Sequence, residues 1–383
     1  MEYNRKIIYL AGFLFSLPIA LASYINSSFI SSFVGEKYVG IMYVLGSIGS
    51  VLALLAAPQI FRKIGGYRFL LIMILLDALS LLVLSFTENI WGIALMFILG
   101  FSMNTLIFFS LDEILKIFSS DSSTGAIRGV YAALSSFAWV VAQLASGIFF
   151  GGISFQSIYF ASFLVMMLFF LVSFFKLKSI PDPNYDQIDL STSVKNFFKN
   201  KELSRAYIIS FLLQFFYCWM IIYTPIYLHN YIGFSWKEIG VIFAIMLLPF
   251  LIIPFPLGRR SDKIGERIML MVGFIIASCA TLLLFFIQQR EVWVWALLLF
   301  STRIGASTIE VMNDSYFFKH IKPENEELVG FYRTAPPVAY IIGPIVASGL
   351  FIFIPSFNFL YLVLGAVMLF GIYLASTISK EDI

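Results

Sequence analysis

Charged side chains are scarce in this sequence. Asp, Glu, Lys and Arg make up only 12% of its 383 residues, against roughly a quarter in ordinary globular chains. Hydrophobic residues make up 60%, and the 43 phenylalanines are too many for one soluble core to hide. The composition therefore excludes a soluble globular protein and leaves no soluble domain of useful size.

Cysteine and histidine are also rare. Cys218 and Cys279 lie inside apolar runs, and His229 and His320 lie near the ends of different runs, so no ligand cluster forms. No Ser/His/Asp constellation and no glycine-rich ATP loop is evident. We therefore expect no enzyme activity, no cofactor, no metal and no ATP-driven pump. The small net charge of +3 likewise predicts no nucleic-acid partner.

Long apolar runs dominate the chain. Runs of about 20 residues have the length that crosses the hydrocarbon core of a bilayer as a helix. We therefore predict an all-α integral membrane protein with twelve transmembrane helices. The predicted spans are 7–30, 37–61, 67–86, 90–115, 126–150, 155–177, 204–229, 237–257, 267–288, 291–317, 327–353 and 356–377.

A polar segment with two prolines, 178–203, separates six spans from six. This spacing predicts an N-terminal six-helix bundle over 1–177 and a C-terminal one over 204–383, joined by a cytoplasmic linker. The second half of the linker could form an amphipathic helix, with Phe197, Phe198 and Leu203 on the membrane side. A solvated linker with a short surface helix is the preferred interpretation.

Lysine and arginine predict the orientation. If the N-terminus lies inside the cell, all but four of the 25 Lys and Arg residues fall in inner segments. The exceptions are Lys37, Lys237 and Arg290 in outer loops and Arg303 within a span. Positive charge favours the cytoplasmic side. We therefore predict that both termini lie in the cytoplasm. The short loops favour the plasma (cell inner) membrane, and we expect a monomeric, multi-pass protein.

Two segments recur at an offset of about 200 residues. The K-I-G core of FRKIGGYR (61–68) returns in SDKIGERI (261–268). GVYAALSSFAWVVAQ (129–143) likewise resembles GFYRTAPPVAYIIGP (330–344). An offset of six spans preserves the direction of each helix, which predicts that the halves are parallel repeats.

Six charges crowd into ten residues in GRRSDKIGER (258–267), between two apolar runs. Gly258, Asp262, Lys263, Gly265 and Arg267 form a spaced pattern of glycines, an aspartate and basic residues. The pattern resembles the loop signature of the major facilitator superfamily, which lies between spans two and three and again between spans eight and nine. In the copy between spans two and three, Pro58 replaces the leading glycine and Arg62 replaces the aspartate.

The resemblance implies a secondary transporter whose halves work by alternating access. It also implies that this loop is a cytoplasmic latch, which holds the halves together in the outward-facing state. The glycines permit close helix approach and a tight turn, and Asp262 suits a helix N-terminus. Lys263 and Arg267 are expected to pair with carboxylates at the cytoplasmic end of span ten. The alternative is that the basic residues of this loop only follow the general preference of cytoplasmic loops for positive charge.

Ionisable residues inside a membrane span are costly and are functional candidates. Arg303 lies about ten residues into span ten, roughly 15 Å deep, and the resemblance places that span on the central cavity. Its guanidinium suits an anionic or hydrogen-bonding solute; a structural ion pair is the alternative. Glu310, two turns later, is expected as a latch partner and is also a candidate for proton coupling. Asp314 and its counterpart Asp112 in span four are predicted latch residues.

Asp77 lies near the middle of span three. A buried carboxyl group can carry a proton, which makes it a candidate for proton coupling. The family places this span at the side of the bundle, so we expect an internal hydrogen bond instead.

Polar and aromatic residues on spans one, four, five and seven are candidate cavity residues. They are Tyr24, Asn26, Asn104, Gln143, Gln214, Tyr217 and Tyr223. With Arg303, the predicted substrate contacts are Tyr24, Asn104, Gln143, Gln214 and Tyr217. Tyrosine and glutamine also form hydrogen bonds that hold membrane helices together, so we expect no more than half of the seven residues to touch solute.

These features predict a secondary active or facilitative transporter of a small solute, which is anionic if Arg303 binds it. The energy comes either from a gradient of H⁺ or another ion or from the gradient of the solute itself. A multidrug/proton efflux antiporter is an alternative, weakened because span five, VVAQLASGIFFGG, has no proline and span one has no carboxylate. A non-transporting solute sensor or lipid scramblase on the same fold is the alternative of a different class.

Overall fold

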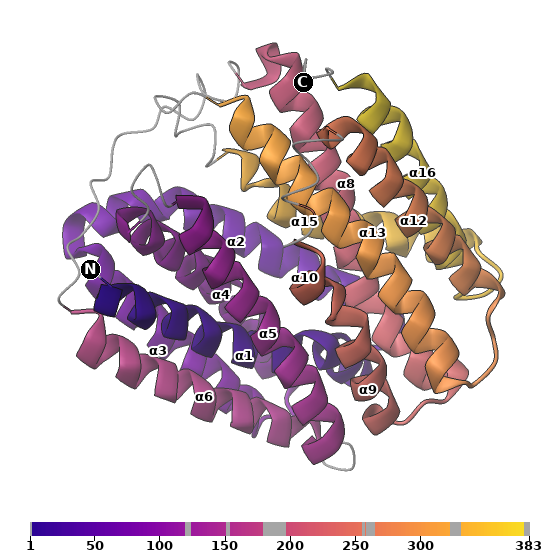
Figure 1. Ribbon diagram of the computed structural model, residues 1–383. Helices are drawn as coiled ribbons and strands as arrows, with labels where there is room; N and C mark the ends of the chain where they lie inside the picture. Colours follow the sequence, from indigo (N-terminus) through magenta and orange to yellow (C-terminus); the bar gives the residue numbers. More distant parts are fainter. Residues whose placement is uncertain are drawn as a thin grey trace. The chain divides into compact units, whose positions relative to one another are not determined.

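The computed structural model describes residues 2–118, 124–150, 154–178, 197–254, 257, 265–321 and 331–378. These residues are almost entirely helical and contain no strand (Figure 1). Eleven of the described helices are long and apolar enough to cross a membrane. The all-α, multi-pass architecture predicted from the sequence is confirmed.

The chain divides into two compact units. The first is Met1–Asp186 with Ser235–Ala244, and the second is Gln187–Phe234 with Ile245–Ile383. The long helices of the first unit are α1 (Glu2–Val34), α2 (Glu36–Ile64), α3 (Gly66–Leu84), α4 (Ile90–Phe118), α5 (Thr124–Phe150) and α6 (Phe155–Lys176). Those of the second unit are α8 (Lys201–Ile226), α12 (Glu266–Phe286), α13 (Val292–Lys319), α15 (Ala335–Phe353) and α16 (Phe359–Thr377). A π-helical turn, η1 (Tyr227–Ile232), extends α8.

The predicted span 237–257 is interrupted. Helix α9 (Trp236–Leu247) ends at a turn at Leu248, and the short α10 (Pro249–Ile252) follows. Pro249 has no backbone N–H and therefore cannot continue the hydrogen-bond ladder of α9. The chain from Ser235 to Ala244 belongs to the first unit, whereas the chain from Ile245 onward belongs to the second. Nothing in the sequence pattern predicts that assignment.

The same helix pairs pack in both units. In the first unit, α1 packs on α5 and α6, and α3 packs on α4 and α6. In the second unit, α8 packs on α15 and α16, and α12 packs on α13 and α16 (Figure 1). Helices α8, α12, α13, α15 and α16 thus correspond in order to α1, α3, α4, α5 and α6. The units are parallel repeats, as the sequence predicts.

The glycines of the K-I-G repeat adopt the same backbone conformation. Gly65 has φ 81° and ψ 149°, and Gly265 has φ 83° and ψ 145°. Each immediately precedes a helix, α3 or α12. This torsion region is essentially restricted to glycine because a Cβ would clash with the backbone. The repeated core therefore marks the same tight turn in both units.

Large apolar side chains are exposed on the long helices. Leu52 is 62% exposed on α2, Leu95 is 61% exposed on α4 and Phe175 is 70% exposed on α6. Ile352 and Phe353, at the end of α15, are 77% and 83% exposed. A soluble monomer rarely exposes so much apolar surface. In a bilayer these side chains contact lipid.

The end of the linker packs into the second unit. Phe197 is fully buried, with ring centroids 5.8 Å from Tyr207 and 4.7 Å from Phe331. Leu203 is only 2% exposed, whereas Phe198 is 51% exposed. The prediction that Phe197 and Leu203 lie on the membrane side is therefore wrong. Both side chains instead fill space inside the bundle, where packing contacts replace lipid contacts.

Candidate functional site

Arg303 lies in the middle of α13 and is 1% exposed. Its guanidinium carbon lies 5.2 Å from the ring centre of Phe216 and 5.3 Å from that of Tyr217, both on α8. Its Nε and Nη1 atoms are buried and have no hydrogen-bond partner among the described residues. Within the same residues it forms no ion pair at contact distance, and Glu310 on the same helix is the carboxylate that interacts with it electrostatically. Buried donors without partners are costly, and they make Arg303 a candidate site for an acceptor group.

Tyr217 connects Arg303 to Glu310. The Tyr217 hydroxyl donates a 2.8 Å hydrogen bond to Oε2 of Glu310, while its ring faces the Arg303 guanidinium. Arg303 and Glu310 are seven positions apart on α13 and so share a face of that helix. The structure thus brings together three residues predicted from the sequence.

A small polar cavity of about 40 Å³ lies beside Glu310. It is lined by Ser210, Leu213, Gln214, Glu310, Asn313, Asp314, Tyr332, Arg333 and Pro336. The predicted contact Gln214 and the predicted latch residues Glu310 and Asp314 therefore line one cavity of the second unit.

A hydrogen-bond chain fixes one wall of this polar cavity. Asn313 Nδ2 donates to the Ala206 carbonyl at 3.0 Å and to the Tyr332 hydroxyl oxygen at 2.8 Å. Tyr332 in turn donates to Oδ1 of Asp314 at 2.8 Å. A phenol keeps its proton at neutral pH, because its ordinary pKa is about 10. The Tyr332 hydroxyl can therefore accept from Asn313 and donate to Asp314 at the same time.

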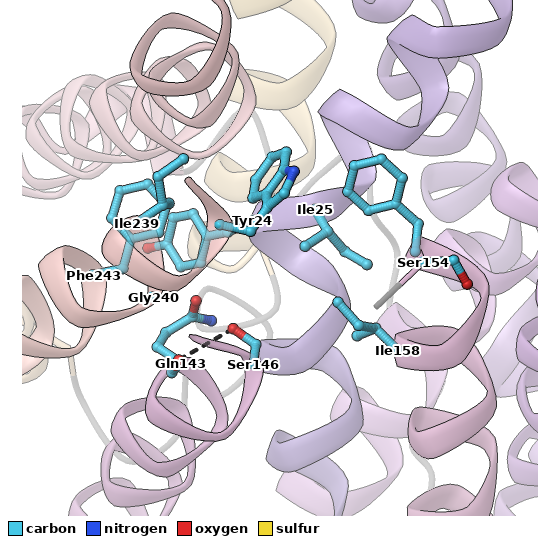
Figure 2. Close-up of a pocket in the computed structure, with 11 residues that line it drawn as sticks. Tyr24, Ile25, Gln143, Ser146, Ser154, Ile158, Ile239, Gly240 and Phe243 are labelled. Atoms are coloured by element: carbon cyan, nitrogen blue, oxygen red, sulfur yellow. Dashed lines mark hydrogen bonds between the residues drawn. The ribbon is translucent and has the colours of Figure 1, made fainter. Parts of the chain in front are cut away.

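A second cavity, of about 110 Å³, lies within the first unit (Figure 2). It is lined by Tyr24, Ile25, Gln143, Ser146, Ser154, Phe155, Ile158, Trp236, Ile239, Gly240 and Phe243. These side chains converge from α1, α5, α6 and the first half of α9, together with Ser154 just before α6 (Figure 2). The predicted contacts Tyr24 and Gln143 both belong to this aromatic cavity.

Gln143 is the main polar group of the aromatic cavity. It is 2% exposed, and its Nε2 donates to the Ala20 carbonyl at 2.7 Å. No described residue donates to its Oε1. The Tyr24 ring lies 4.6 Å from the Phe243 ring, centroid to centroid. The cavity thus offers aromatic rings and one amide oxygen.

The first half of α9 touches α5 backbone to backbone beside this cavity. A Cβ built on Gly240 would lie 2.5 Å from the Gly147 Cα and 2.9 Å from the Gln143 carbonyl oxygen. No side chain fits at that distance. The two glycines therefore allow the helices to approach as small residues do in lipid.

The remaining candidate contacts lie elsewhere. Asn104 is on α4, and its buried Oδ1 has no hydrogen-bond partner among the described residues. Asn26 Oδ1 accepts a 2.6 Å hydrogen bond from Tyr159. Tyr223 packs on Phe351 at 5.4 Å between centroids. None of the three lines either cavity described above, and Asn26 and Tyr223 have interhelical partners.

Asp77 does not form the expected hydrogen bond. It is 1% exposed on α3, and neither carboxylate oxygen has a hydrogen-bond partner among the described residues. The hydroxyl of Ser80, one turn away, donates instead to the Leu76 carbonyl at 3.0 Å. Serines in helices often bond to their own backbone in this way. The prediction of an internal hydrogen bond for Asp77 is therefore wrong.

The predicted latch is described only in part. Gly258, Asp262 and Lys263 lie outside the described residues, and Gly265 forms the turn before α12. Arg267 forms no ion pair in the part of the chain that the structure describes, so its expected pairing with span ten is wrong. The Asp112 side chain is half-buried in α4.

The ion pair between α12 and α13 is formed the other way round from the prediction, with the carboxylate on α12 and the basic residue on α13. Lys319 Nζ lies 2.6 Å from Oε1 of Glu266, and Ser315 donates to the same oxygen at 3.0 Å. Glu266 is 3% exposed. Successive helix residues point about 100° apart. Glu266 therefore faces α13, while Arg267 does not.

Sequence reasoning missed several residues that join these helices. Glu202, at the start of α8, accepts a hydrogen bond from Tyr316 of α13 and pairs with Arg205 at 2.6 Å. Asn313 and Tyr332 were also missed as cavity residues. A signal existed for Tyr332, because it lies in the repeated segment 330–344. The others carry no local pattern.

Repeated helical units with buried charged and polar groups inside membrane-length helices define a multi-pass membrane transporter fold. A family model for the Major Facilitator Superfamily matches residues 8–324 and 220–382, and the chain belongs to this family. No curated protein matches the sequence.

Solved transporter structures share the fold. The crystal structure of a point mutant of the nucleoside transporter NupG matches with a TM-score of 0.78 and 12% identity, covering 97% of this chain and 98% of that one. A bacterial homologue of the human lysosomal transporter Spinster, in an inward-facing and unoccupied conformation, matches with a TM-score of 0.70 and 13% identity, covering 98% and 94%. At these identities the likeness shows the fold alone.

Proposed function

We propose that this protein is a secondary transporter that moves a small anionic solute across the plasma membrane by alternating access. The observation that carries the proposal is the buried Arg303 guanidinium, which has Nε and Nη1 donors without partners among the described residues. The repeated units support the transport mechanism, because such repeats are the parts that move in alternating access.

Arginine chemistry favours an anion. A guanidinium presents a planar fork of donors that matches a carboxylate or phosphate group. The rings of Phe216 and Tyr217 offset part of the cost of burying the charge through cation–π contacts. They do not satisfy the hydrogen-bond donors. An oxyanion on the solute would do so, and it would also neutralise the buried charge.

Glu310 is the proposed coupling group. It is linked to the Arg303 site through the Tyr217 hydroxyl. Binding of a proton or another cation to Glu310 would therefore alter the hydrogen bond of Tyr217, whose ring contacts Arg303. Asp77 remains a second candidate, because its buried carboxylate has no hydrogen-bond partner among the described residues. The energy source is an ion gradient or the gradient of the solute itself.

The remaining proposals concern placement. Both termini lie in the cytoplasm, and the loop 258–267 is the cytoplasmic latch of a monomeric protein. Tyr24 and Gln143 are proposed solute contacts on the first unit, supported by the aromatic cavity that they line. Its volume suits a ring-sized or short alkyl group.

A thermal-shift screen tests the proposal. Purified protein in detergent is heated with organic anions, sugars, amino acids and cationic drugs, as wild type and as Arg303→Ala. The matched control is Arg68→Ala, because Arg68 is an exposed arginine. A ligand stabilises the folded state by about 2.7 kcal/mol at a hundredfold excess over Kd. We expect an anion class to stabilise the wild type and Arg68→Ala but not Arg303→Ala.

Uptake into liposomes then tests transport with the same anion class. Accumulation or exchange of the anion supports a transporter, whereas binding without transport supports a solute sensor. If neutral or cationic compounds stabilise wild type and Arg303→Ala alike, Arg303 is structural and the efflux antiporter replaces this proposal. Lipid transfer between leaflets without solute transport would support a scramblase.

A further inference from the structure

We propose that the polar cavity of the second unit binds a monovalent metal cation, with Na⁺ as the first choice. The cavity lies between α8, which provides Ser210 and Gln214, and α13, which provides Glu310, Asn313 and Asp314. Ion binding here goes beyond the proposed solute site at Arg303. Arg303 itself does not line this cavity.

Asn313 supplies the most direct indication of a ligand. Its side chain is 1% exposed and lines the cavity. Hydrogen bonds from Nδ2 to Ala206 and Tyr332 fix the orientation of the amide. The oxygen on the other side, Oδ1, is buried and accepts no hydrogen bond from any described residue. A buried acceptor without a partner calls for a donor or a cation.

Two carboxylates complete the set of oxygens. Glu310 uses Oε2 to accept from Tyr217, and Asp314 uses Oδ1 to accept from Tyr332. No described residue donates to Oε1 of Glu310 or Oδ2 of Asp314. Both residues line the same cavity as Asn313. Carboxylate and amide oxygens are the ligands that hard cations prefer.

Charge and size select a monovalent ion. The cavity is lined by two carboxylates and by the guanidinium of Arg333, so one formal negative charge remains. A single positive charge would neutralise it, whereas a divalent ion would leave an excess. A volume of about 40 Å³ is large enough for an ion together with a water molecule. The described residues contain no group of three His, Cys, Asp or Glu side chains suited to a metal ion, so the ligands proposed here are two carboxylates and the Asn313 amide oxygen.

The position of the cavity gives the ion a role. Glu310 contacts the cavity with one side and Tyr217 with the other, and Tyr217 faces Arg303. A cation on Glu310 would polarise this hydrogen bond and hold the Tyr217 ring in place against Arg303. This coupling role rests on the proposed transport function, whereas the binding of the ion does not.

Ion-dependent thermal unfolding of the full-length protein tests the site. The melting temperature is measured against NaCl, KCl and choline chloride at constant ionic strength and pH. The variants are Asp314→Asn and Glu310→Gln, which keep an acceptor for Tyr332 and Tyr217 while removing a charge. The control is Glu291→Gln, an exposed residue that precedes the first turn of the same helix.

We expect NaCl to raise the melting temperature of the wild type and of Glu291→Gln in a saturable way that choline chloride does not reproduce. Asp314→Asn and Glu310→Gln should each weaken the apparent Na⁺ affinity about tenfold or more. Equal melting curves in all three salts would overturn the proposal. So would an unchanged Na⁺ response in both cavity variants. Stabilisation by acid alone, with no response to Na⁺, would identify a proton site instead.

Transport separates this proposal from the proposed function. Solute uptake into liposomes that is unaffected by a Na⁺ gradient, together with an absent Na⁺ shift, would overturn the cation site and leave the transporter intact. A Na⁺ shift that depends on Asp314, without transport of any stabilising solute, would support the site and overturn the transporter.

Discussion

The hydroxyl of Tyr217 donates a 2.8 Å hydrogen bond to Glu310, across the packing of α8 against α13. The same ring contacts the Arg303 guanidinium. One side chain of α8 therefore touches two charged residues of α13. The behaviour of either charge depends on where this ring is held.

Tyr217→Phe should lower the stability of the second unit more than the removal of another tyrosine hydroxyl from α8. The variant keeps the ring against Arg303 but removes a donor from a carboxylate, which costs about 1–3 kcal/mol. Tyr207→Phe is the matched control, because it removes a hydrogen bond to the neutral Thr334 hydroxyl and should cost about 0.5–1.5 kcal/mol. Thermal unfolding in detergent measures both. Equal losses would show that the bond to Glu310 has no special weight.

Phe197→Ala should destabilise the second unit by about 3–5 kcal/mol, as expected for emptying a buried aromatic site. Phe197 is fully buried, and its neighbour Phe198 is 51% exposed. Phe198→Ala should therefore change stability by only about 0.5 kcal/mol. Melting curves of the two variants, recorded in the same detergent, provide the comparison. If both variants behave alike, the end of the linker is not anchored by Phe197.

Gly240→Ala should separate the first half of α9 from α5. The added Cβ would meet the Gly147 backbone at 2.5 Å, and backbone atoms cannot move aside as a flexible side chain can. Overpacking of this kind costs about 1–3 kcal/mol or more. The control is Gly349→Ala on α15, where no atom lies within 4 Å of the new Cβ.

Gly349→Ala should be neutral or stabilise by up to about 1 kcal/mol, because alanine favours helix more than glycine does. Thermal unfolding and the labelling of a cysteine placed at Ser146, in the aromatic cavity, measure the two effects. We expect faster labelling in Gly240→Ala alone. Unchanged labelling and stability in that variant would contradict the close contact.

Gly265→Ala should cost about 1–3 kcal/mol although no atom lies within 4 Å of the new Cβ. The penalty comes from the backbone, because φ 83° with ψ 145° is strained for any residue with a Cβ. Gly65→Ala should behave similarly, since its torsions are nearly the same. Gly233 has φ 84° and ψ 24°, a left-handed conformation that asparagine tolerates. Gly233→Asn should therefore be milder than Gly265→Asn in the same unfolding assay.

The sequence by itself determined the membrane architecture. The bilayer acts as a uniform solvent, so the length of an apolar run reports directly on a membrane span. The placement of lysine and arginine predicts the orientation of the spans. The repeated K-I-G core predicted the turn at Gly265, because backbone torsion is a local property that glycine reveals. Arg303 and Glu310 were recognisable for a similar reason: a charge inside an apolar run stands out wherever its partners lie.

Only the tertiary structure decided which side chains meet. Asp77 has no hydrogen-bond partner among the described residues, Glu266 rather than Arg267 pairs with α13, and Phe197 lies inside a bundle instead of on its surface. The membership of Ser235–Ala244 in the first unit also depends on contacts between distant segments. Such contacts follow from helix rotation and packing, and hydropathy says nothing about either. The polar cavity of the second unit combines both contributions: Glu310, Asn313 and Asp314 share a face of α13 by their spacing, but only tertiary packing adds the α8 and Tyr332 side chains that enclose them.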